Sequence, residues 1–342
     1  MEHADFNFKN ILVIDFGQLG DVVLSLPALN ALRRKFPAAK ITVMAGKIPG
    51  EVIRLGGVAD EIVPVDKVLL RKSSKVWSIW QILRLVNEIR GRKFDLIIDL
   101  HSLYETNLLA YLSGTKHRLL SNRANRSLDY LGNFKPKPPR EDKAMHIIDR
   151  YFDVLSPLGI EGSEKKIELF PALADLEYVD RECFGDLIPG FQNAVGLFPG
   201  AGNPSRCWSL KNFAELADRL SRNNLRPIVF IGPEETGLKN TIIRDFPVGT
   251  IICEKLTISQ FIAALSRMPM FVANDTGPLH LALAVGVPTI VLLYESAPKT
   301  FMPPSEKLFL IQNKQIEKIE VDEVYQSVVK ILEVKDGSVP PA

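Results

Sequence analysis

Short apolar runs alternate with amphipathic segments along almost the whole chain, and this alternation limits the fold more than any other feature. Asn10–Asp15 is an apolar run suited to a buried parallel strand, and Asp21–Phe36 follows with its apolar residues on one helical face. After a proline-rich, charged segment at Asn133–Asp142, the alternation starts again at Ala194–Phe198. Two successive βα arrays predict an α/β fold with two doubly wound parallel sheets.

The expected elements fill both arrays. The strands are short and largely apolar, and they are expected at 10–15, 41–44, 61–64, 94–100, 116–120, 194–198, 227–232, 250–253, 270–273 and 289–294. The helices show helical spacing or a start signal, and they are expected at 21–36, 76–90, 146–158, 209–221, from 257, from 278 and at 321–334. Ser209 is expected to cap one helix, and Thr257 with Gln260 forms a capping box before another.

The length of the chain suits two domains. It has 342 residues, and a domain averages roughly 150 residues. We place an N-terminal domain at residues 1–170 and a C-terminal domain at residues 171–335. Parallel sheets of this kind bind ligands at the carboxyl ends of their strands, so two facing sheets would hold one substrate each.

The sequence shows no sign of a membrane span or a metal site. It contains no apolar run of the ~18–20 residues that a span needs. Its first residues also lack the basic-then-apolar order of a signal peptide, so a cytoplasmic protein is expected. The three cysteines, Cys183, Cys207 and Cys253, are far apart in sequence, and neither they nor the five histidines form a metal motif. We expect no disulfide framework and no bound metal.

Positive charge is concentrated in one stretch of the first array. Residues 67–150 contain 17 lysines and arginines against 8 aspartates and glutamates, a local net charge of +9, whereas the whole chain carries only +2. Such a stretch can attract a phosphate-rich polymer or an anionic membrane surface. A solvated basic face explains the charge equally well.

A glycine-containing loop follows the first expected strand. Gly17 and Gly20 allow a tight turn and a close approach of a ligand to the backbone, and Asp21 lies at the start of the next helix. The loop matches neither the dinucleotide-binding GxGxxG pattern nor a P-loop, so both interpretations are poor. Taken alone, Asp21 is explained more simply as a helix N-cap than as a catalytic group.

Another loop, at residues 199–209, follows the first strand of the second array. Gly200 and Gly202 let backbone N–H groups approach an anion, and Arg206 adds a forked, permanently charged donor suited to phosphate. A plain surface loop, with a solvated Arg206 and with Trp208 packed on the core, is the competing interpretation.

A third loop, Asn274–His280, leads from an expected strand into a helix with Pro278 in its first turn. The N–H groups of Thr276 and Gly277 lie at the positive end of the helix dipole, which favours a phosphate. Helix capping by Asp275 or Thr276, with His280 partly packed, explains the same residues. Both explanations can hold together, because capping and anion binding use different donors.

Together these motifs resemble one known family. The segment GQLGDVVLSLPAL at residues 17–29 resembles the opening of the glycosyltransferase family 9 heptosyltransferases. Pro199–Ala201 with Arg206 and Trp208, followed by Asp275–His280, resemble the donor-side motifs of that family in the same order. The resemblance covers nearly the whole chain and implies the GT-B fold, two Rossmann-like domains around a cleft. It also implies inverting transfer of L-glycero-D-manno-heptose from an ADP-linked donor to the lipopolysaccharide inner core, without an essential metal.

The resemblance assigns roles to individual residues. Asp21 corresponds to the general base that activates the acceptor hydroxyl, and Arg206 to a basic residue, often lysine, that neutralises the diphosphate. Leu256 lies where the family holds the adenine through backbone groups, and Glu234 or Glu235 is expected at the ribose. One departure is Ser209, because a proline commonly follows the tryptophan in this family. The donor site implied in this way comprises Gly20, Gly200, Arg206, Glu234, Leu256, Asp275, Thr276, Gly277 and His280.

The acceptor side carries no motif that matches the family. Arg118, Arg123 and Arg126 are predicted to bind the acceptor, because they cluster in the basic stretch and arginine makes forked contacts with anionic groups. The expected partners are a nucleotide-diphosphate sugar such as ADP-heptose, an anionic glycolipid and, peripherally, the inner face of the cytoplasmic membrane. No nucleic acid is expected.

Two alternatives stay open from the sequence. A nucleotide-sugar epimerase on the same fold would need no acceptor, which leaves the basic stretch without a role. A non-catalytic protein that binds a nucleotide sugar would never turn it over, and Asp21 would then be only a cap.

Overall fold

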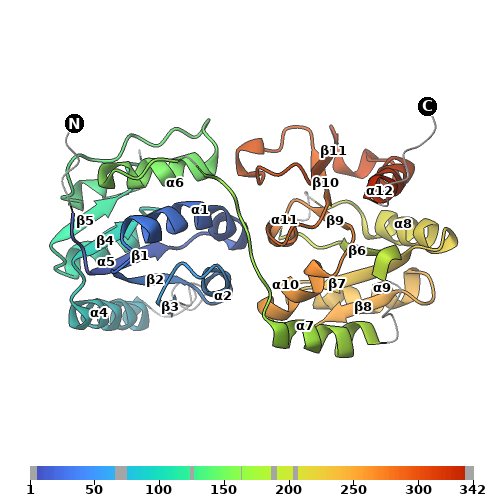
Figure 1. Ribbon diagram of the computed structural model, residues 1–342, viewed down its shortest axis with the longest axis horizontal. Helices are drawn as coiled ribbons and strands as arrows, with labels where there is room; N and C mark the ends of the chain where they lie inside the picture. The colour runs from blue at the N-terminus through green and yellow to red at the C-terminus, as the bar shows by residue number, and fades with distance from the viewer. Residues whose placement is uncertain are drawn as a thin grey trace. The chain divides into compact units, whose positions relative to one another are not determined.

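The computed structural model describes residues 6–65, 75–123, 127–162, 164–185, 191–202 and 207–335. The chain divides into two compact units, Met1–Ile167 and Glu168–Ala342. Each unit contains one parallel sheet with its own helices, which Figure 1 colours from blue to green in the first unit and from green to red in the second. The predicted α/β fold with two parallel sheets is confirmed.

The first unit is built on a five-stranded parallel sheet with the order β3-β2-β1-β4-β5. Its strands are β1 (Asn10–Asp15), β2 (Lys40–Gly46), β3 (Glu61–Val65), β4 (Leu96–Asp99) and β5 (His117–Leu120). The chain runs from β1 outward to β3 and then returns to the other side of β1. The strand order therefore reverses between β1 and β4, and sheets of this type bind ligands where that reversal occurs.

Helices provide the cover that both faces of a parallel sheet need. They are α1 (Leu19–Lys35), α2 (Lys47–Leu55), α4 (Lys75–Arg92), α5 (Tyr104–Leu112) and α6 (Ile147–Leu155). Val86 of α4 and Leu109 of α5 pack with Leu12 and Ile14 of β1 in one buried cluster. Helix α1 contacts both α2 and α6, so these three helices form a second layer.

The second unit has a six-stranded parallel sheet with the order β11-β10-β9-β6-β7-β8. Its strands are β6 (Ala194–Phe198), β7 (Arg226–Ile231), β8 (Ile251–Glu254), β9 (Phe271–Asn274), β10 (Thr289–Tyr294) and β11 (Leu308–Asn313). Counted within the unit, this is the 3-2-1-4-5-6 order of dinucleotide-binding folds, with its reversal between β6 and β9.

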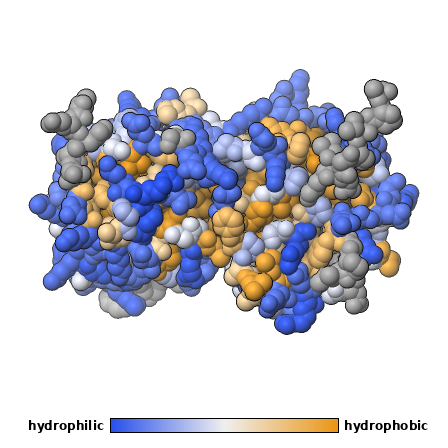
Figure 2. Space-filling view, viewed as in Figure 1, coloured by the Kyte–Doolittle hydropathy of each residue, from blue (hydrophilic) through white to orange (hydrophobic). Residues whose placement is uncertain are grey.

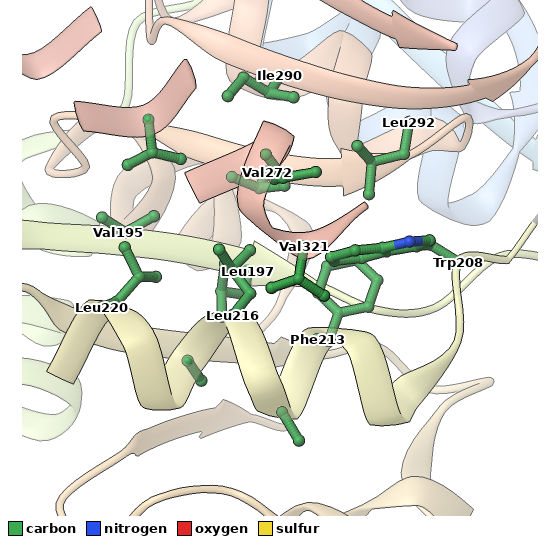
Figure 3. Packing of buried hydrophobic residues seen from close by; sticks show 14 of the residues in the cluster. Val195, Leu197, Trp208, Phe213, Leu216, Leu220, Val272, Ile290, Leu292 and Val321 are labelled. Carbon is green, nitrogen blue, oxygen red and sulfur yellow. The ribbon is translucent and has the colours of Figure 1, made fainter. Parts of the chain in front are cut away.

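Helix α8 and the residues before it close one face of the second sheet. The helices of this unit are α7 (Leu173–Val179), α8 (Leu210–Arg222), α9 (Lys239–Asp245), α10 (Ile258–Ser266), α11 (Gly277–Ala284) and α12 (Val321–Lys335). Figure 3 shows Phe213, Leu216 and Leu220 of α8 pointing toward the sheet, with Trp208 against Phe213. The Trp208 indole donates a hydrogen bond of 2.9 Å to the Ile319 carbonyl, so this large side chain is buried with its polar group satisfied.

The local start signals of two helices are confirmed. The Ser209 hydroxyl accepts a hydrogen bond of 3.1 Å from the Asn212 N–H at the start of α8. Thr257 and Gln260 form both bonds of the capping box before α10, at 2.9 and 3.2 Å.

Several elements were not predicted, and α2 shows why. Its sequence contains Pro49 and Gly50, which discourage a helix by intrinsic propensity. Pro49 occupies the first turn, where a missing N–H costs nothing, and a Cβ on Gly50 would lie 2.9 Å from Ile62. Close packing on β3 therefore favours glycine here. The other unpredicted elements are α5, α7, α9 and β11.

Hydrophilic side chains cover much of the face shown in Figure 2, with hydrophobic ones between them. Among the described residues, no helix is long and apolar enough to cross a membrane.

Candidate active site

The first candidate site lies where β1 and β4 end side by side. Ile14 is paired with Asp99 across the two strands, and the Leu100 N–H donates a hydrogen bond of 3.1 Å to the Ile14 carbonyl. The loops that follow the two strands therefore begin next to each other, although they are separated by more than 80 residues of sequence.

Asp21 is the third residue of α1. Gln18, rather than Asp21, occupies the N-cap position. The Asp21 carboxylate accepts a hydrogen bond of 3.0 Å from the Gln18 N–H and so closes the first turn from inside the helix. Gly20 precedes it and is buried. The simple N-cap interpretation is therefore wrong in detail, and the carboxylate lies near the end of β1.

A buried ionic network, which was not predicted from the sequence, supports this corner. Asp15 is fully buried, and its Oδ1 lies 2.8 Å from His101 Nε2. Its other oxygen accepts a hydrogen bond of 2.7 Å from the Ser25 hydroxyl, and the Gly17 N–H donates to Oδ1 at 3.2 Å. Both oxygens are satisfied, which is what a buried carboxylate requires.

Electrostatics favour the ionised form of this pair. Burial alone would raise the pKa of Asp15, but the bonds from His101, Ser25 and Gly17 and the charge of His101 hold it below the ordinary value of 3.8. Burial likewise opposes protonation of His101, yet nearby Asp15, together with two further aspartates, raises its pKa above 6.5. Asp15 and His101 therefore form an aspartate–imidazolium ion pair between the lowered pKa of Asp15 and the raised pKa of His101, a pH range that includes mildly acidic pH.

Gly17 shows how closely these groups approach one another. A Cβ added at Gly17 would lie 2.7 Å from Asp21 Cβ, 3.1 Å from His101 Nε2 and 3.2 Å from Asp15 Oδ1. Asp21 and His101 therefore border the same small space, and a side chain at residue 17 would displace one of them.

Two more titratable groups complete the first site. Asp99 is fully buried, accepts bonds from the Ser102 N–H at 2.8 Å and the Asn107 amide at 3.0 Å, and has its pKa raised by burial. The Tyr151 hydroxyl donates to the Asp21 carbonyl at 3.4 Å, and its ring meets the His101 ring edge-on at 5.6 Å. Burial and the charges of Asp15 and Asp21 raise the pKa of Tyr151 well above 10.

The predicted acceptor arginines are bound within the first unit. Arg118 donates to the carbonyls of Thr115 and Leu131 at 2.6 and 3.1 Å. Arg123 donates to the His101 carbonyl at 2.6 Å and forms an ion pair with Glu141 at 3.0 Å, so it holds the loop after β4. Arg126 lies outside the described residues. An acceptor role for these arginines stays a prediction.

The second candidate site lies where β6 and β9 end. The Asn274 side chain joins the two loops: its oxygen accepts a hydrogen bond of 2.9 Å from the Trp208 N–H, and its amide donates to the Pro199 carbonyl at 2.9 Å. Sequence reasoning assigned no role to Asn274. Arg206, the predicted diphosphate ligand, lies outside the described residues.

Glu235 packs more tightly than Glu234 against the Gly200 loop. A Cβ on Gly200 would come within 2.3 Å of the Glu235 side chain, which would have to move, whereas Glu234 lies 3.9 Å from a Cβ placed on Gly202. Burial and the neighbouring Glu234 raise the pKa of Glu235, whereas Glu234 is exposed. The carboxylate after the second strand of such a unit is where a ribose is bound in related folds, which makes Glu235 the better candidate.

Helix α11 begins directly after β9. Thr276 is at its N-cap position, Gly277 and Pro278 form its first turn, and His280 is 6% exposed within the same helix. Asp275 lies between the strand and this cap. The N–H groups of a first turn have no intrahelical acceptor, so this terminus suits an anion. Leu256 lies in the loop after β8 and is partly exposed.

Comparison with known proteins assigns the family. The profile of glycosyltransferase family 9 (heptosyltransferase) matches residues 82–328, well over half of the chain. The chain belongs to glycosyltransferase family 9. It is thus a glycosyltransferase, which sets aside the epimerase and the non-catalytic binding protein.

Individual relatives agree with this assignment. Lipopolysaccharide heptosyltransferase 3 of Escherichia coli is 24% identical over 278 residues, covering 80% of each protein. A family 9 glycosyltransferase of Veillonella parvula superposes with a TM-score of 0.81 at 21% identity, over 96% of this chain and 99% of that one. The E. coli ADP-heptose lipopolysaccharide heptosyltransferase II gives a TM-score of 0.77 at 19% identity, over 96% and 100%.

The described part of the chain holds no cluster of three or more His, Cys, Asp or Glu residues arranged to bind a metal ion. The Cys183 and Cys253 thiols lie close enough to interact, which lowers the pKa of Cys183 and, together with burial, raises that of Cys253.

The Asp15–His101 pair makes stability depend on pH. The raised pKa of His101 stabilises the folded state below about pH 6.5, and this stability is lost as the pH rises through the folded-state pKa. The lowered pKa of Asp15 stabilises the folded state above about pH 4, and this stability is lost as the pH falls through the folded-state pKa. Asp15→Asn removes the charge and keeps the shape. We expect its loss of Tm to be largest between about pH 5 and 6.5 and to shrink toward pH 9, at roughly 2–4 °C per kcal/mol. Thermal unfolding across this pH range measures it; a Tm difference that is constant or grows with pH would contradict the ion pair.

Proposed function

We propose that this enzyme transfers a heptose from ADP-heptose to an anionic glycolipid of the lipopolysaccharide inner core, with inversion at the anomeric carbon. Support comes from the family and from relatives named as lipopolysaccharide heptosyltransferases. The observation that carries the proposal is the Asp21 carboxylate, fixed in the first turn of α1 next to the end of β1.

In this mechanism the acceptor is deprotonated in the first unit. The acceptor oxygen attacks the anomeric carbon while the bond from that carbon to the diphosphate oxygen breaks on the opposite face. The hydroxyl proton passes to Asp21, a step of general base catalysis typically worth about 10²–10⁴-fold in rate. Asp21 is placed to accept this proton because the Gln18 N–H holds its carboxylate in the first turn of α1, and its side chain borders the space beside Gly17.

The donor belongs in the second unit. The first turn of α11, at Thr276 and Gly277, offers N–H groups to the diphosphate, and Arg206 supplies a compensating charge. Glu235 receives the ribose hydroxyls, and the backbone near Leu256 receives the adenine. We further propose that no metal is needed, because arginine and helix N–H groups can stabilise the leaving diphosphate.

The acceptor is a glycolipid, so the first unit must approach a membrane. Helix α5 exposes one apolar face, formed by Tyr104, Leu108 and Tyr111, which are 52%, 40% and 50% exposed and lie one helical turn apart. Arg118 lies over the Tyr111 ring at 5.5 Å. Tyrosine and arginine next to an apolar stripe suit the headgroup region of an anionic membrane, and the basic excess of residues 67–150 adds attraction.

Asp21→Asn tests the general base. Asparagine can still accept the bond from the Gln18 N–H, so the turn is kept and only the charge is lost. We expect less than about a tenth of the wild-type rate of transfer from ADP-heptose to a truncated core acceptor, with ADP affinity within a few-fold. A variant above that rate would rule out Asp21 as the base.

The same assay with and without EDTA tests whether the reaction needs a metal ion. We expect equal rates, and a loss of activity in EDTA would disprove metal independence.

Arg206→Ala tests the diphosphate contact. A charge-assisted hydrogen bond is worth roughly 1.5–3 kcal/mol, so ADP affinity should fall by about 10- to 100-fold while adenosine affinity changes little. Glu235→Gln is the comparison, because the ribose is common to both ligands and both affinities should fall together. Calorimetry that finds equal losses for ADP and adenosine in Arg206→Ala would refute the assignment.

Vesicle binding tests the membrane contact. We expect co-sedimentation with phosphatidylglycerol vesicles that weakens with salt, and little with phosphatidylcholine. Leu108→Asp on α5 should weaken binding by about tenfold, since it removes apolar contact and adds a repelled charge. Ile243→Asp is the matched control, because Ile243 is a 60% exposed apolar residue on a helix of the second unit. If the two substitutions weaken vesicle binding equally, or if binding does not depend on salt, the membrane contact is refuted. The basic residues of 67–150 would then form only a solvated surface.

A further inference from the structure

Three aspartates meet at the end of β1 and β4, and this arrangement needs a compensating charge. Asp15 and Asp99 are fully buried, and Asp21 lies across the Gly17 turn from Asp15. Like charges this close destabilise one another unless a proton or a cation lies between them. His101 is the titratable group that all three aspartates act on.

We propose that His101 is a positioning residue for Asp21, and that Asp15 holds the His101 ring for this purpose. The inference rests on the proposed role of Asp21 as the general base. In this arrangement the imidazolium supplies the compensating charge, and its ring forms one wall of the space that fixes where the Asp21 carboxylate lies.

Hydrogen bonds hold both the backbone and the ring of His101. Its backbone N–H donates to Asp99 at 3.1 Å, its backbone carbonyl accepts from Arg123 at 2.6 Å, and its ring Nε2 bonds to Asp15 at 2.8 Å. Tyr151 of α6 meets the ring edge-on. The His101 side chain keeps 14% of its surface exposed, whereas Asp15 keeps none, so the ring forms the solvent side of the pair.

Asp15 is fully committed to this corner, where it holds the His101 ring, the Gly17 turn and Ser25 of α1. Its oxygens are occupied by Gly17, Ser25 and His101, so it cannot receive a proton from a substrate without breaking the network. A buried carboxylate bonded to one imidazole nitrogen fixes the ring orientation and stabilises the imidazolium, as in the aspartate–histidine couple of hydrolases. Here the oriented ring borders a second carboxylate, Asp21.

The groups that face His101 determine its protonation. Asp15 on β1, Asp21 on α1 and Asp99 on β4 favour the imidazolium, and burial opposes it. From the other elements, Tyr151 and Arg150 lie on α6, and Arg123 contacts the His101 carbonyl. The raised pKa keeps His101 protonated at pH values somewhat above 6.5, and the ring loses its proton as the pH rises past that pKa. The rate of transfer should therefore decline above the pKa of His101.

His101→Gln and Asp15→Asn test the proposal in the full-length enzyme, with ADP-heptose and a truncated core acceptor. A displacement of about 1 Å can cost 10²-fold in rate, so we expect kcat of His101→Gln to fall about 10- to 100-fold with the KM for donor within about threefold. The decline of kcat/KM at high pH, the alkaline limb, should disappear in His101→Gln. In Asp15→Asn this limb should move to lower pH, because the carboxylate that favours the imidazolium is gone.

A control variant and a separate comparison make the outcome decisive. His117→Gln makes the same substitution at the start of β5, where His117 packs between Phe8 and Phe134, and should leave kcat and the alkaline limb unchanged. A merely structural role for His101 would lower the rate at every pH without moving the limb. A His101→Gln rate within threefold of wild type, or a limb that stays in place in Asp15→Asn, would overturn the proposal. Asp21→Asn distinguishes the two ideas: if it stays active, the base assignment fails whatever His101 does.

Discussion

Parallel pairing of β1 with β4, and of β6 with β9, is the constraint on which both sites depend. Each pair lies where the strand order of its sheet reverses, so the two following loops begin side by side and then diverge. The polar side chains at these strand ends cannot reach bulk water, and they bond to the neighbouring loop instead. Asp15 reaches His101 in the first unit, and Asn274 reaches Trp208 and Pro199 in the second. The loops are therefore held by side chains of the core strands.

Much of the fold could be predicted because its signals are local. Strands β1, β6 and β10 were predicted with the bounds observed, since each is a continuous apolar run. The Ser209 cap and the Thr257 capping box were also predicted, because each depends on residues only three positions apart in sequence. Helix α2 was not, because its proline and glycine argue against a helix until packing on β3 is known. The edge strand β11 also begins with an apolar run, at residues 308–311, but it was not predicted, and only Ile311 of its six residues is buried.

Less of the candidate site could be predicted, because its contacts join distant residues. Asp15 and His101 are 86 residues apart, and only the register of β1 with β4 brings them together. The available signal was that both follow or end apolar strands, where neighbouring carboxyl ends meet. Side-chain direction places Glu235 more closely than Glu234 against the Gly200 loop, and the sequence does not specify that direction. The same limit applies to Cys183 and Cys253, which are distant in sequence although their thiols lie close enough to interact.

The two units use the same position for opposite chemistry. Asp99 ends β4 and Asn274 ends β9, and these strands occupy equivalent places beside the reversal in their sheets. Both side chains fasten a loop: Asp99 accepts from Ser102 and Asn107, and Asn274 bonds to Trp208 and Pro199. An amide is needed at residue 274 because it accepts a hydrogen bond from one loop and donates one to the other, whereas an ionised carboxylate can only accept. At residue 99 an acid is tolerated because burial raises its pKa and the His101 imidazolium lies next to it.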